Sequence, residues 1–424
     1  MYSTVFNPTE NRRVIAGTEM LVNCEHYNSR LQSTVEGTEG LDGKAILKQA
    51  AERAASASLS RLFGEHTPDD RKLSLISEYY ANVGLGKLHF DQIASDLVEQ
   101  SSSCFVKGWN ANFPGIDRTT CTYTEGFLQG LYHAVYGKPV DVNEIACMHS
   151  GADRCQFKIT HGRTSSVEPI RMKDQESYRQ GRKASSGGHA HLTSETVDNE
   201  MIAGGILQNM PLIGNELGLC PVFIQDDGRP GAHLSSVPID FYSLLFSDYA
   251  AQMAGLGREE EARIRLIGSV EACSYFTWGK ILSSHEWRGM IGPMVKNTED
   301  KIYGLVALAN MLGRGKWTVV DFKPGERLEV ESYNNYESES FERLDFQPKT
   351  CSCSTMNGTA TAHMNLVYPA HELNTEGIGD FKTTEVSCIA RGHDRCRFVS
   401  ERRELTAAEI AAQRGPDGAS CAIA

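Results

Sequence analysis

The 424-residue sequence has no long hydrophobic run and no excess of positive charge. Its most apolar stretch, Ile302 to Leu312, is shorter than the roughly 18 residues of a membrane-spanning helix and contains Asn310. Lys and Arg number 42 against 54 Asp and Glu, and a net charge of −12 argues against a surface that binds nucleic acid. The first residues also lack the charged-then-apolar order of a secretory signal. We therefore expect a soluble, cytoplasmic protein that binds neither membranes nor nucleic acid.

Several motifs of nucleotide-binding and metal enzymes are missing as well. The sequence has no Gly-x4-Gly-Lys-Ser/Thr phosphate loop, no glycine-rich dinucleotide loop and no paired-histidine metal motif. Its 40% apolar and 23% charged residues are ordinary for a folded protein, and its length allows two or three domains. The sequence thus predicts a globular protein without an ATPase of its own.

Cysteine, in contrast, is plentiful, with 12 residues in the chain. Disulfides form mainly in secreted proteins, and we expect this chain to stay in the cytoplasm. Reduced thiols kept for metal binding or catalysis are therefore the better interpretation, and their spacing decides between the two.

Most of these cysteines belong to an internal duplication. Residues 144–157 and 385–398 align without gaps and share a Glu, two Cys, a Gly, an Asp, an Arg and a Phe. Upstream, Cys121 and Cys353 are each followed by Gly at +5 and by Tyr at +15. Such a pattern of identities indicates two homologous units, each with the order Cys, helix, Glu-x2-Cys-x7-Cys-x-Phe.

We expect an α+β fold in which each unit packs N-terminal helices on an antiparallel sheet. Apolar residues at helical spacing predict helices over 45–63, 71–83, 240–255 and 259–282. The Glu and the last two Cys of each motif fall on a predicted hairpin, because alternating strands flank a turn rich in Gly and Asp. Glu144 and Cys147 have opposite parity, so the strand must bulge or end before Cys147 if both face one site.

The composition also suggests how the chain divides. We expect the units at 1–162 and 236–405, a flexible linker rich in Ser, Gly, Arg and Lys at 163–200, a connecting segment packed on the second unit at 201–235, and a tail at 406–424. A tandem chain can satisfy internally the two-fold symmetry that single modules reach by pairing. We therefore expect an internal pseudo-dimer, which could still form a homodimer.

Three Cys and one Glu in each unit form a plausible metal-binding set. Zinc prefers four ligands, and three thiolates with one carboxylate leave no open position for water, which is typical of a structural site. Paired structural cysteines without a metal remain the alternative. Cys351 lies two residues before Cys353 and could replace it, although the Gly and Tyr offsets favour Cys353.

With these motifs the sequence resembles two copies of the 4-vinyl-reductase (4VR) domain. This small-molecule-binding module also forms the sensor region of aromatic-responsive transcriptional activators. The resemblance implies two structural zinc ions per chain, held by Cys121, Glu144, Cys147 and Cys155 and by Cys353, Glu385, Cys388 and Cys396. Those activators continue into an ATPase and a DNA-binding helix-turn-helix, and this sequence has neither, so we expect it to lack that output.

The leading hypothesis is therefore a zinc-containing protein that binds or senses a small apolar or aromatic molecule. His26, Trp109 and Trp278 are candidate contacts for that ligand, because aromatic side chains and histidine commonly line such pockets. His89, Tyr80, His285 and Trp287 are further aromatic candidates for a pocket wall.

Two other functions stay open. The reactive cluster Cys24, Glu25, His26 and Tyr27 has no Cys or His counterpart in the second unit, and it could serve an enzyme of tetrapyrrole or specialised metabolism. The third hypothesis is a scaffold or signalling partner whose output lies on another polypeptide. Replacing His26 separates the first two, because an enzyme would lose turnover while a sensor would at most bind its ligand more weakly.

Overall fold

A computed structural model describes residues 3–64, 66–165, 168, 170, 191–210, 212–349, 353–369, 379–404 and 406–414. Most of the predicted linker at 163–200 and of the predicted tail at 406–424 lies outside these residues, and so does Cys351.

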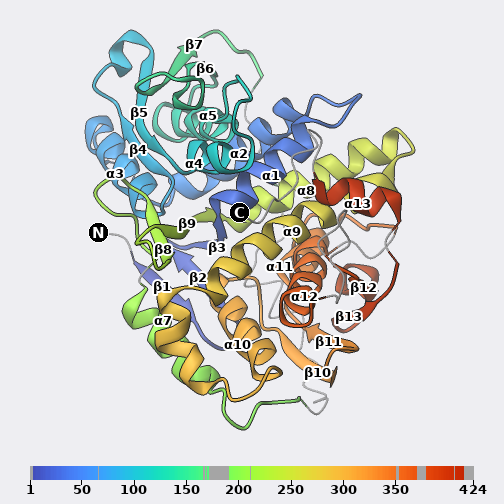
Figure 1. Ribbon diagram of the computed structural model, residues 1–424. Helices are drawn as coiled ribbons and strands as arrows, with labels where there is room; N and C mark the ends of the chain where they lie inside the picture. Colours follow the sequence, from blue (N-terminus) through green and yellow to red (C-terminus); the bar gives the residue numbers. More distant parts are fainter. Residues whose placement is uncertain are drawn as a thin grey trace.

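The same series of elements occurs twice along the described chain (Figure 1). The series is a β-hairpin, three helices, a second hairpin, two helices and a third hairpin. In the first half it consists of β2 (Arg12–Ile15), β3 (Thr18–Cys24), α1 (Glu25–Glu36), α2 (Gly43–Leu59), α3 (Asp69–Asn82), β4 (Gly86–His89), β5 (Leu97–Ser103), α4 (Cys104–Asn112), α5 (Thr122–Tyr136), β6 (Asp141–Ala146) and β7 (Cys155–Thr160). In the second half it consists of β8 (Cys220–Ile224), β9 (Pro230–Pro238), α8 (Ile239–Gly255), α9 (Glu259–Leu282), α10 (Asp300–Ala309), β10 (Thr318–Lys323), β11 (Arg327–Ser332), α11 (Tyr336–Arg343), α12 (Ser354–Val367), β12 (Phe381–Ser387) and β13 (Cys396–Arg402).

A few elements stand outside this series. They are β1 (Thr4–Asn7), α7 (Asn199–Asn209), α13 (Ala407–Arg414) and the short turns η1 (Ile93–Ser95), η2 (Met148–Ser150), η3 (Trp287–Ile291), η4 (Gly292–Met294), η5 (Asn310–Leu312) and η6 (Ile389–Arg391).

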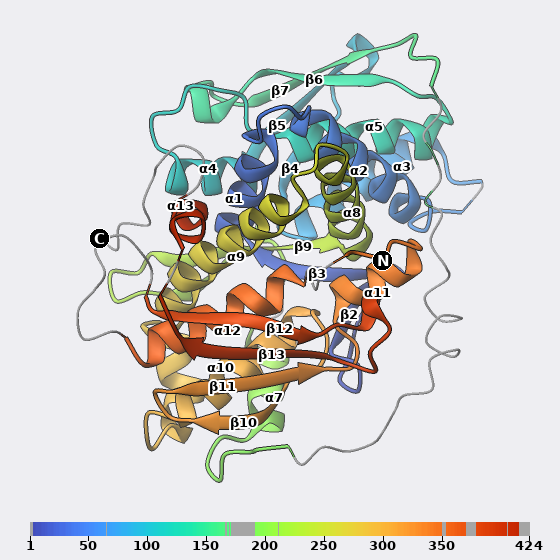
Figure 2. The same ribbon diagram turned by 90° about the vertical axis from the view of Figure 1, so that its right-hand side faces the viewer.

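Each half contains one four-stranded antiparallel sheet, and the two sheets have the same strand order. The first is β4-β5-β7-β6 and the second is β10-β11-β13-β12. Figure 2 shows them at opposite ends of the molecule with the helices between them. The expected α+β arrangement of two similar units, each with helices packed on an antiparallel sheet, is thereby confirmed.

A third sheet joins the two halves, with the strand order β1-β2-β3-β9-β8. At its centre β3 pairs with β9 in antiparallel fashion, and Val22 lies opposite Ser236. Since α1 begins directly after β3 and α8 directly after β9, Val22 and Ser236 stand at the same distance from their helices. The two central hairpins are therefore related by a local two-fold axis through this pair.

The segment at 201–235, expected to connect the units, contributes to both halves. Its helix α7 lies against α10 of the second half. Its strand β8 pairs with β9, which in turn pairs with β3 of the first half. In the order of elements, β8 and β9 hold the place in the second half that β2 and β3 hold in the first.

Two glycines let a helix after each first cysteine pack closely on its neighbour. A Cβ atom at Gly126 of α5 would lie 2.2 Å from the carbonyl oxygen of Lys48 in α2. One at Gly358 of α12 would lie 2.7 Å from the Cβ of Val270 in α9. Both distances are far below van der Waals contact, which explains why both units have Gly at +5. This contact fixes the start of α5 and α12, where the metal-binding motif begins.

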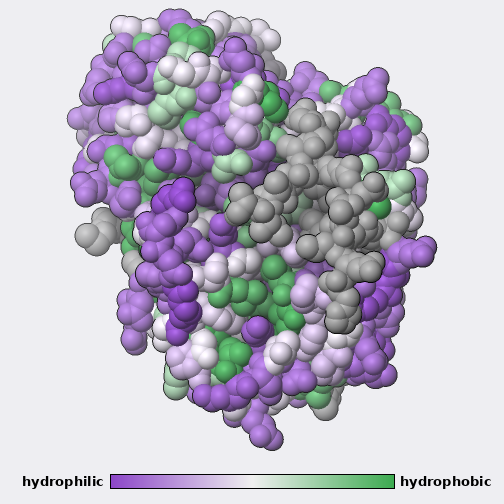
Figure 3. Space-filling view, in the orientation of Figure 1, coloured by the Kyte–Doolittle hydropathy of each residue, from purple (hydrophilic) through white to green (hydrophobic). Residues whose placement is uncertain are grey.

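The molecular surface is mostly polar on the face drawn in Figure 3, apart from a hydrophobic patch in its lower half near α10 and α12. Among the described residues, no helix combines the length and hydrophobicity needed to cross a membrane.

Candidate functional site

Four residues from three elements converge in the first half. Cys121 precedes the first turn of α5, Glu144 lies on β6, Cys147 follows the end of β6, and Cys155 begins β7. Their ligand atoms all lie within 4.8 Å of one another, and all four residues are buried. We call these residues the first quartet.

The second quartet consists of Cys353, Glu385, Cys388 and Cys396, and it has the same form. These residues hold the corresponding places before α12, on β12, after β12 and at the start of β13. Their ligand atoms also lie within 4.8 Å of one another and are likewise buried. The structure thus brings together both sets of four residues that the sequence predicted.

The expected bulge in the strand is confirmed in both halves. The pairing of β6 with β7 shifts its register between Glu144 and Ala146, and the pairing of β12 with β13 shifts between Glu385 and Ser387. A bulge changes the face to which the following residues point. The Glu and the next Cys can therefore reach the same site despite their opposite parity.

The sulfur atoms are spaced as a tetrahedral metal site requires. Cys121 Sγ lies 3.7 Å from Cys155 Sγ, and Cys155 Sγ lies 3.9 Å from Cys147 Sγ. In the second quartet, Cys353 Sγ lies 3.8 Å from Cys388 Sγ and 4.0 Å from Cys396 Sγ. With Zn–S bonds of about 2.3 Å, sulfurs at the corners of a tetrahedron are about 3.8 Å apart. The same distances are far too long for disulfides, whose S–S bond is about 2.05 Å.

Each carboxylate offers one oxygen to its site. Oε2 of Glu144 accepts the backbone N–H of Cys121 at 2.8 Å, and Oε2 of Glu385 accepts that of Cys353 at 2.9 Å. In both residues Oε1 is buried and has no hydrogen-bond partner in the described part of the chain. A buried carboxylate oxygen without a partner is costly, and a metal ion would satisfy it. Both quartets therefore fit a metal ion in the chemistry and in the placement of their donors.

Burial controls the charge state of the quartets when no cation is bound. It raises the pKa of Glu144 to about 8 and raises the pKa of Glu385 well above its usual value. It also raises the pKa values of the Cys121 and Cys353 thiols. Since four buried negative charges would repel one another, a divalent cation is needed before all four groups can be ionised together.

Backbone amides support the sulfurs from outside each quartet. The N–H of Met148 donates to Cys155 Sγ at 3.4 Å, and the N–H of Ile389 donates to Cys396 Sγ at 3.4 Å. Donors of this kind stabilise thiolates and fix their orientation.

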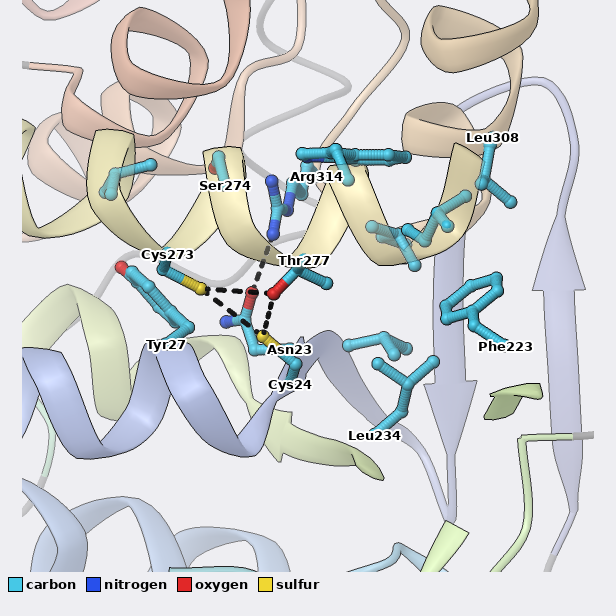
Figure 4. A pocket seen from close by; sticks show the side chains of 15 residues that line it. Asn23, Cys24, Tyr27, Phe223, Leu234, Cys273, Ser274, Thr277, Leu308 and Arg314 are labelled. Carbon is cyan, nitrogen blue, oxygen red and sulfur yellow. Dashed lines mark hydrogen bonds between the residues drawn. The ribbon is translucent and has the colours of Figure 1, made fainter. Parts of the chain in front are cut away.

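A separate cavity lies where the two halves meet, along one side of α9 (Figure 4). The space between its walls measures about 470 Å³, counting the part that opens to solvent. Small-molecule sites commonly have volumes of about 300–1,000 Å³. Its walls come from β3, α1, β8, β9, α9, α10 and the turn after η5, and they include Val22, Asn23, Cys24, Tyr27, Phe223, Leu234, Cys273, Ser274, Thr277, Trp278, Leu308 and Arg314.

The cavity contains a hydrogen-bonded pair of thiols. Cys24 Sγ lies 3.4 Å from Cys273 Sγ and 3.2 Å from Thr277 Oγ1. Burial acts to raise the pKa of Cys24, but the hydrogen bonds from Cys273 and Thr277 lower it below its usual value. The two sulfurs come from different halves of the chain, so this contact belongs to the junction.

The structure separates the residues of the predicted reactive cluster. Cys24 and Tyr27 line the cavity, whereas Glu25 accepts the backbone N–H of His233 at 2.7 Å. His26 packs its ring 4.3 Å from that of Phe276, and burial lowers its pKa. The cavity is therefore lined by two of these four neighbours along the chain and not by the cluster as a whole.

The predicted ligand contacts are also placed differently from one another. Trp278 lines the cavity, while His26 lies outside its lining. Trp109 is buried in the first half, where its Nε1 donates to Gln32 at 3.2 Å.

Sequence analysis overlooked Arg314 and Cys273, which lie in the cavity wall far from any motif. A signal for them exists in the duplication. Counted from the first Cys of each quartet, the second half has Thr355, Thr359 and His363 where the first has Tyr123, Phe127 and Leu131. Such a change from apolar to polar residues on one helix face indicates a different environment in the second half.

Comparisons with known proteins add a family to this geometry. Residues 109–161 match the family model of the 4VR domain, and all of the first quartet lies within them. A region of 97 residues is 28% identical to Uncharacterized protein MJ0745 of Methanocaldococcus jannaschii. It covers 23% of this chain and 50% of that protein, so the chain spans about half the length of the curated relative it matches.

Among solved structures, the chain is similar to the phenol-responsive sensory domain of the transcription activator PoxR with phenol. The likeness covers 42% of this chain and 90% of that one, at 14% identity and a TM-score of 0.32.

Proposed function

The first half of this chain carries a 4VR domain, and from that premise we propose that the protein is a small-molecule sensor with two structural zinc ions. The observation that carries the proposal is the cavity of about 470 Å³ beside α9, enclosed by both halves. It combines apolar walls with a few polar groups, which is the usual composition of a ligand site.

Zinc would be held by the two quartets, one ion in each half. Three thiolates and one carboxylate fill the tetrahedral shell, so the ion has a structural role without an open position for water. It would tie the last hairpin of each half to the helix that follows the first cysteine. Because the ligands must lose protons to bind, metal binding and local folding are coupled.

The chain would act as an internal pseudo-dimer. We take β8 at Cys220 as the start of the second unit, because β8 and β9 repeat the places of β2 and β3. The antiparallel pairing of β3 with β9 then supplies the interface that two separate modules would otherwise form. The residues between the two units serve as the linker.

The output of the sensor would lie on another polypeptide. The sequence has no phosphate loop that could serve an ATPase. The proposal therefore includes a partner that responds to the ligand-bound state, with the protein acting in the cytoplasm.

Native mass spectrometry of protein purified without chelators tests this function. We expect a mass increase of two zinc ions per chain and, in a fraction of the molecules, one further small molecule. Leu308→Trp fills the apolar side of the cavity, so it should remove the small molecule and retain both metals. A small molecule retained equally by Leu308→Trp would contradict binding in this cavity.

A further inference from the structure

The two ends of the cavity beside α9 differ in chemistry (Figure 4). Phe223, Leu234 and Leu308 form one apolar end. Asn23, Thr277 and Arg314 approach one another at the other end. A ligand that fills both ends needs an apolar body and a polar head.

Three hydrogen-bond donors at the polar end have no acceptor among the residues that the structure describes. Arg314 donates from Nη2 to Asn23 Oδ1 at 2.8 Å and from Nη1 to Thr359 Oγ1 at 3.2 Å, but its Nε is buried without a partner. The Nδ2 of Asn23 and the hydroxyl of Tyr27 are likewise buried without partners there. A ligand head that suits this end must therefore accept hydrogen bonds.

Arg314 also lacks a counter-charge. Its side chain is in a residue only 7% exposed, both of its hydrogen-bond acceptors are neutral, and no ion pair joins it to a carboxylate among the described residues. Guanidinium groups stay protonated in proteins, and burying one without an anion is costly.

Arg12 shows how this chain otherwise treats a buried arginine. It is 1% exposed, and its Nη2 meets Glu339 Oε2 at 2.6 Å. Within the described part of the chain Arg314 has no such partner, but it lies on a cavity that an anion can enter.

We propose that this cavity binds a small carboxylate with an apolar, single-ring or similarly sized body, and that Arg314 is its counter-charge. The Nε of Arg314 and the Nδ2 of Asn23 donate to the carboxylate, and the apolar end holds the body. The inference rests on the proposed sensor function and specifies the class of its ligand.

Calorimetric titration of the zinc-loaded full chain with benzoate and with its neutral analogue benzamide tests the proposal. We expect benzoate to bind at least about 10-fold more tightly, because a charge-assisted hydrogen bond is stronger than a neutral one. In Arg314→Gln, benzoate affinity should fall about 10-fold or more, to the level of benzamide. Arg397→Gln removes the same charge from β13, where Arg397 pairs with Glu329, and it should leave the affinity unchanged.

A second variant keeps the test independent of the folding of Arg314→Gln. Asn23→Asp places a carboxylate beside Arg314 and so supplies the missing anion from within the protein. It should raise the melting temperature and abolish benzoate binding, whereas Arg12→Gln should lower the melting temperature because it breaks an existing ion pair.

Equal affinity for benzoate and benzamide, or unchanged benzoate binding in Arg314→Gln, would overturn the assignment of Arg314. The sensor function would survive that outcome, since a neutral ligand would still occupy the cavity. Absence of benzoate binding at millimolar concentration would also overturn it, and the native mass spectrum would then show separately whether the cavity holds another molecule.

Discussion

The helix that follows the first cysteine of each quartet differs sharply between the two halves. In α5, Tyr123, Phe127 and Leu131 face the interior, and all three are buried. In α12, the residues at the same distances from the cysteine are Thr355, Thr359 and His363, and these are buried too. The same frame thus encloses an apolar interior once and a polar interior once.

Aromatic rings fill the first half. The ring of Tyr123 lies 5.1 Å from that of Phe105 and 4.9 Å from that of Phe241, and Phe127 lies 4.8 Å from Tyr80. Such contacts add to the stabilisation from burial alone. This half is packed as a structural support.

The second half has hydrogen bonds in the corresponding place. Thr359 accepts from Arg314, where the first half has the ring of Phe127. The ring of His363 packs edge-on against Trp278 at 4.8 Å. The comparison indicates that one unit kept a closed core while the other exchanged its rings for a cavity with polar groups.

The largest expected effect concerns what the halves share, the metal site. Cys147→Ala and Cys388→Ala should each reduce the zinc content from two to one per chain. Each should also lower the free energy of unfolding by about 4 kcal/mol or more, because a structural metal contributes directly to folding. Elemental analysis and denaturant titration measure the two effects.

Cys220→Ala is the matched control for these variants. Cys220 is buried but belongs to neither quartet, so its variant should keep both metals. If Cys388→Ala removed both ions, the two sites would not be the independent equivalents that we describe.

The helix crossings should respond unequally to the same substitution. Gly126→Ala drives a Cβ into a backbone carbonyl and should cost about 3 kcal/mol or more, whereas Gly358→Ala meets a valine side chain that can move and should cost about 1–3 kcal/mol. Thermal and denaturant unfolding check this order. A larger loss in Gly358→Ala would contradict the closer packing of the first half.

The polar interior of the second half should show itself in acid. Burial, followed by the charge of Arg314, lowers the pKa of His363 to about 3. The unfolded chain takes up a proton near pH 6.5 and the folded chain does not, so the stability from neutral His363 is lost as the pH falls from about 6.5 to about 3. His363→Leu, which installs the residue of the first half, should remove this loss.

The difference should be about 2 kcal/mol at pH 5, at about 1.4 kcal/mol per pKa unit. It is measured as the change in unfolding free energy between pH 7 and pH 5 for both proteins. Metal loss in acid affects both alike, so parallel curves would show that His363 is protonated in the folded protein.

The smallest effect concerns one tyrosine in each half. Tyr80 and Tyr336 hydrogen-bond to Thr124 and Thr355, each at 2.8 Å. Tyr80→Phe and Tyr336→Phe should therefore each cost about 1 kcal/mol. Double-mutant cycles with the threonines measure the coupling, and a clear inequality would show that these contacts differ between the halves.

The sequence predicted the parts of this structure that depend on local spacing. The two quartets follow from short intervals between Cys and Glu, and the bulge follows from the parity of Glu144 and Cys147. The helices at 240–255 and 259–282 were predicted within one residue of α8 and α9, because their apolar residues repeat over many turns.

Long-range contacts could not be predicted in this way. Nothing local to Val22 indicates that it lies opposite Ser236. Arg314 meets Asn23 and Thr359, which are 291 and 45 residues away in the chain. The cavity therefore became visible only when distant segments were placed side by side.

X-ray absorption at the zinc edge, on protein purified without chelators, tests the central claim most directly. We predict two zinc ions per chain, each with three sulfur neighbours at about 2.3 Å and one oxygen at about 2.0–2.2 Å. Protein that is folded without zinc, or zinc whose nearest neighbours include no sulfur, would contradict it.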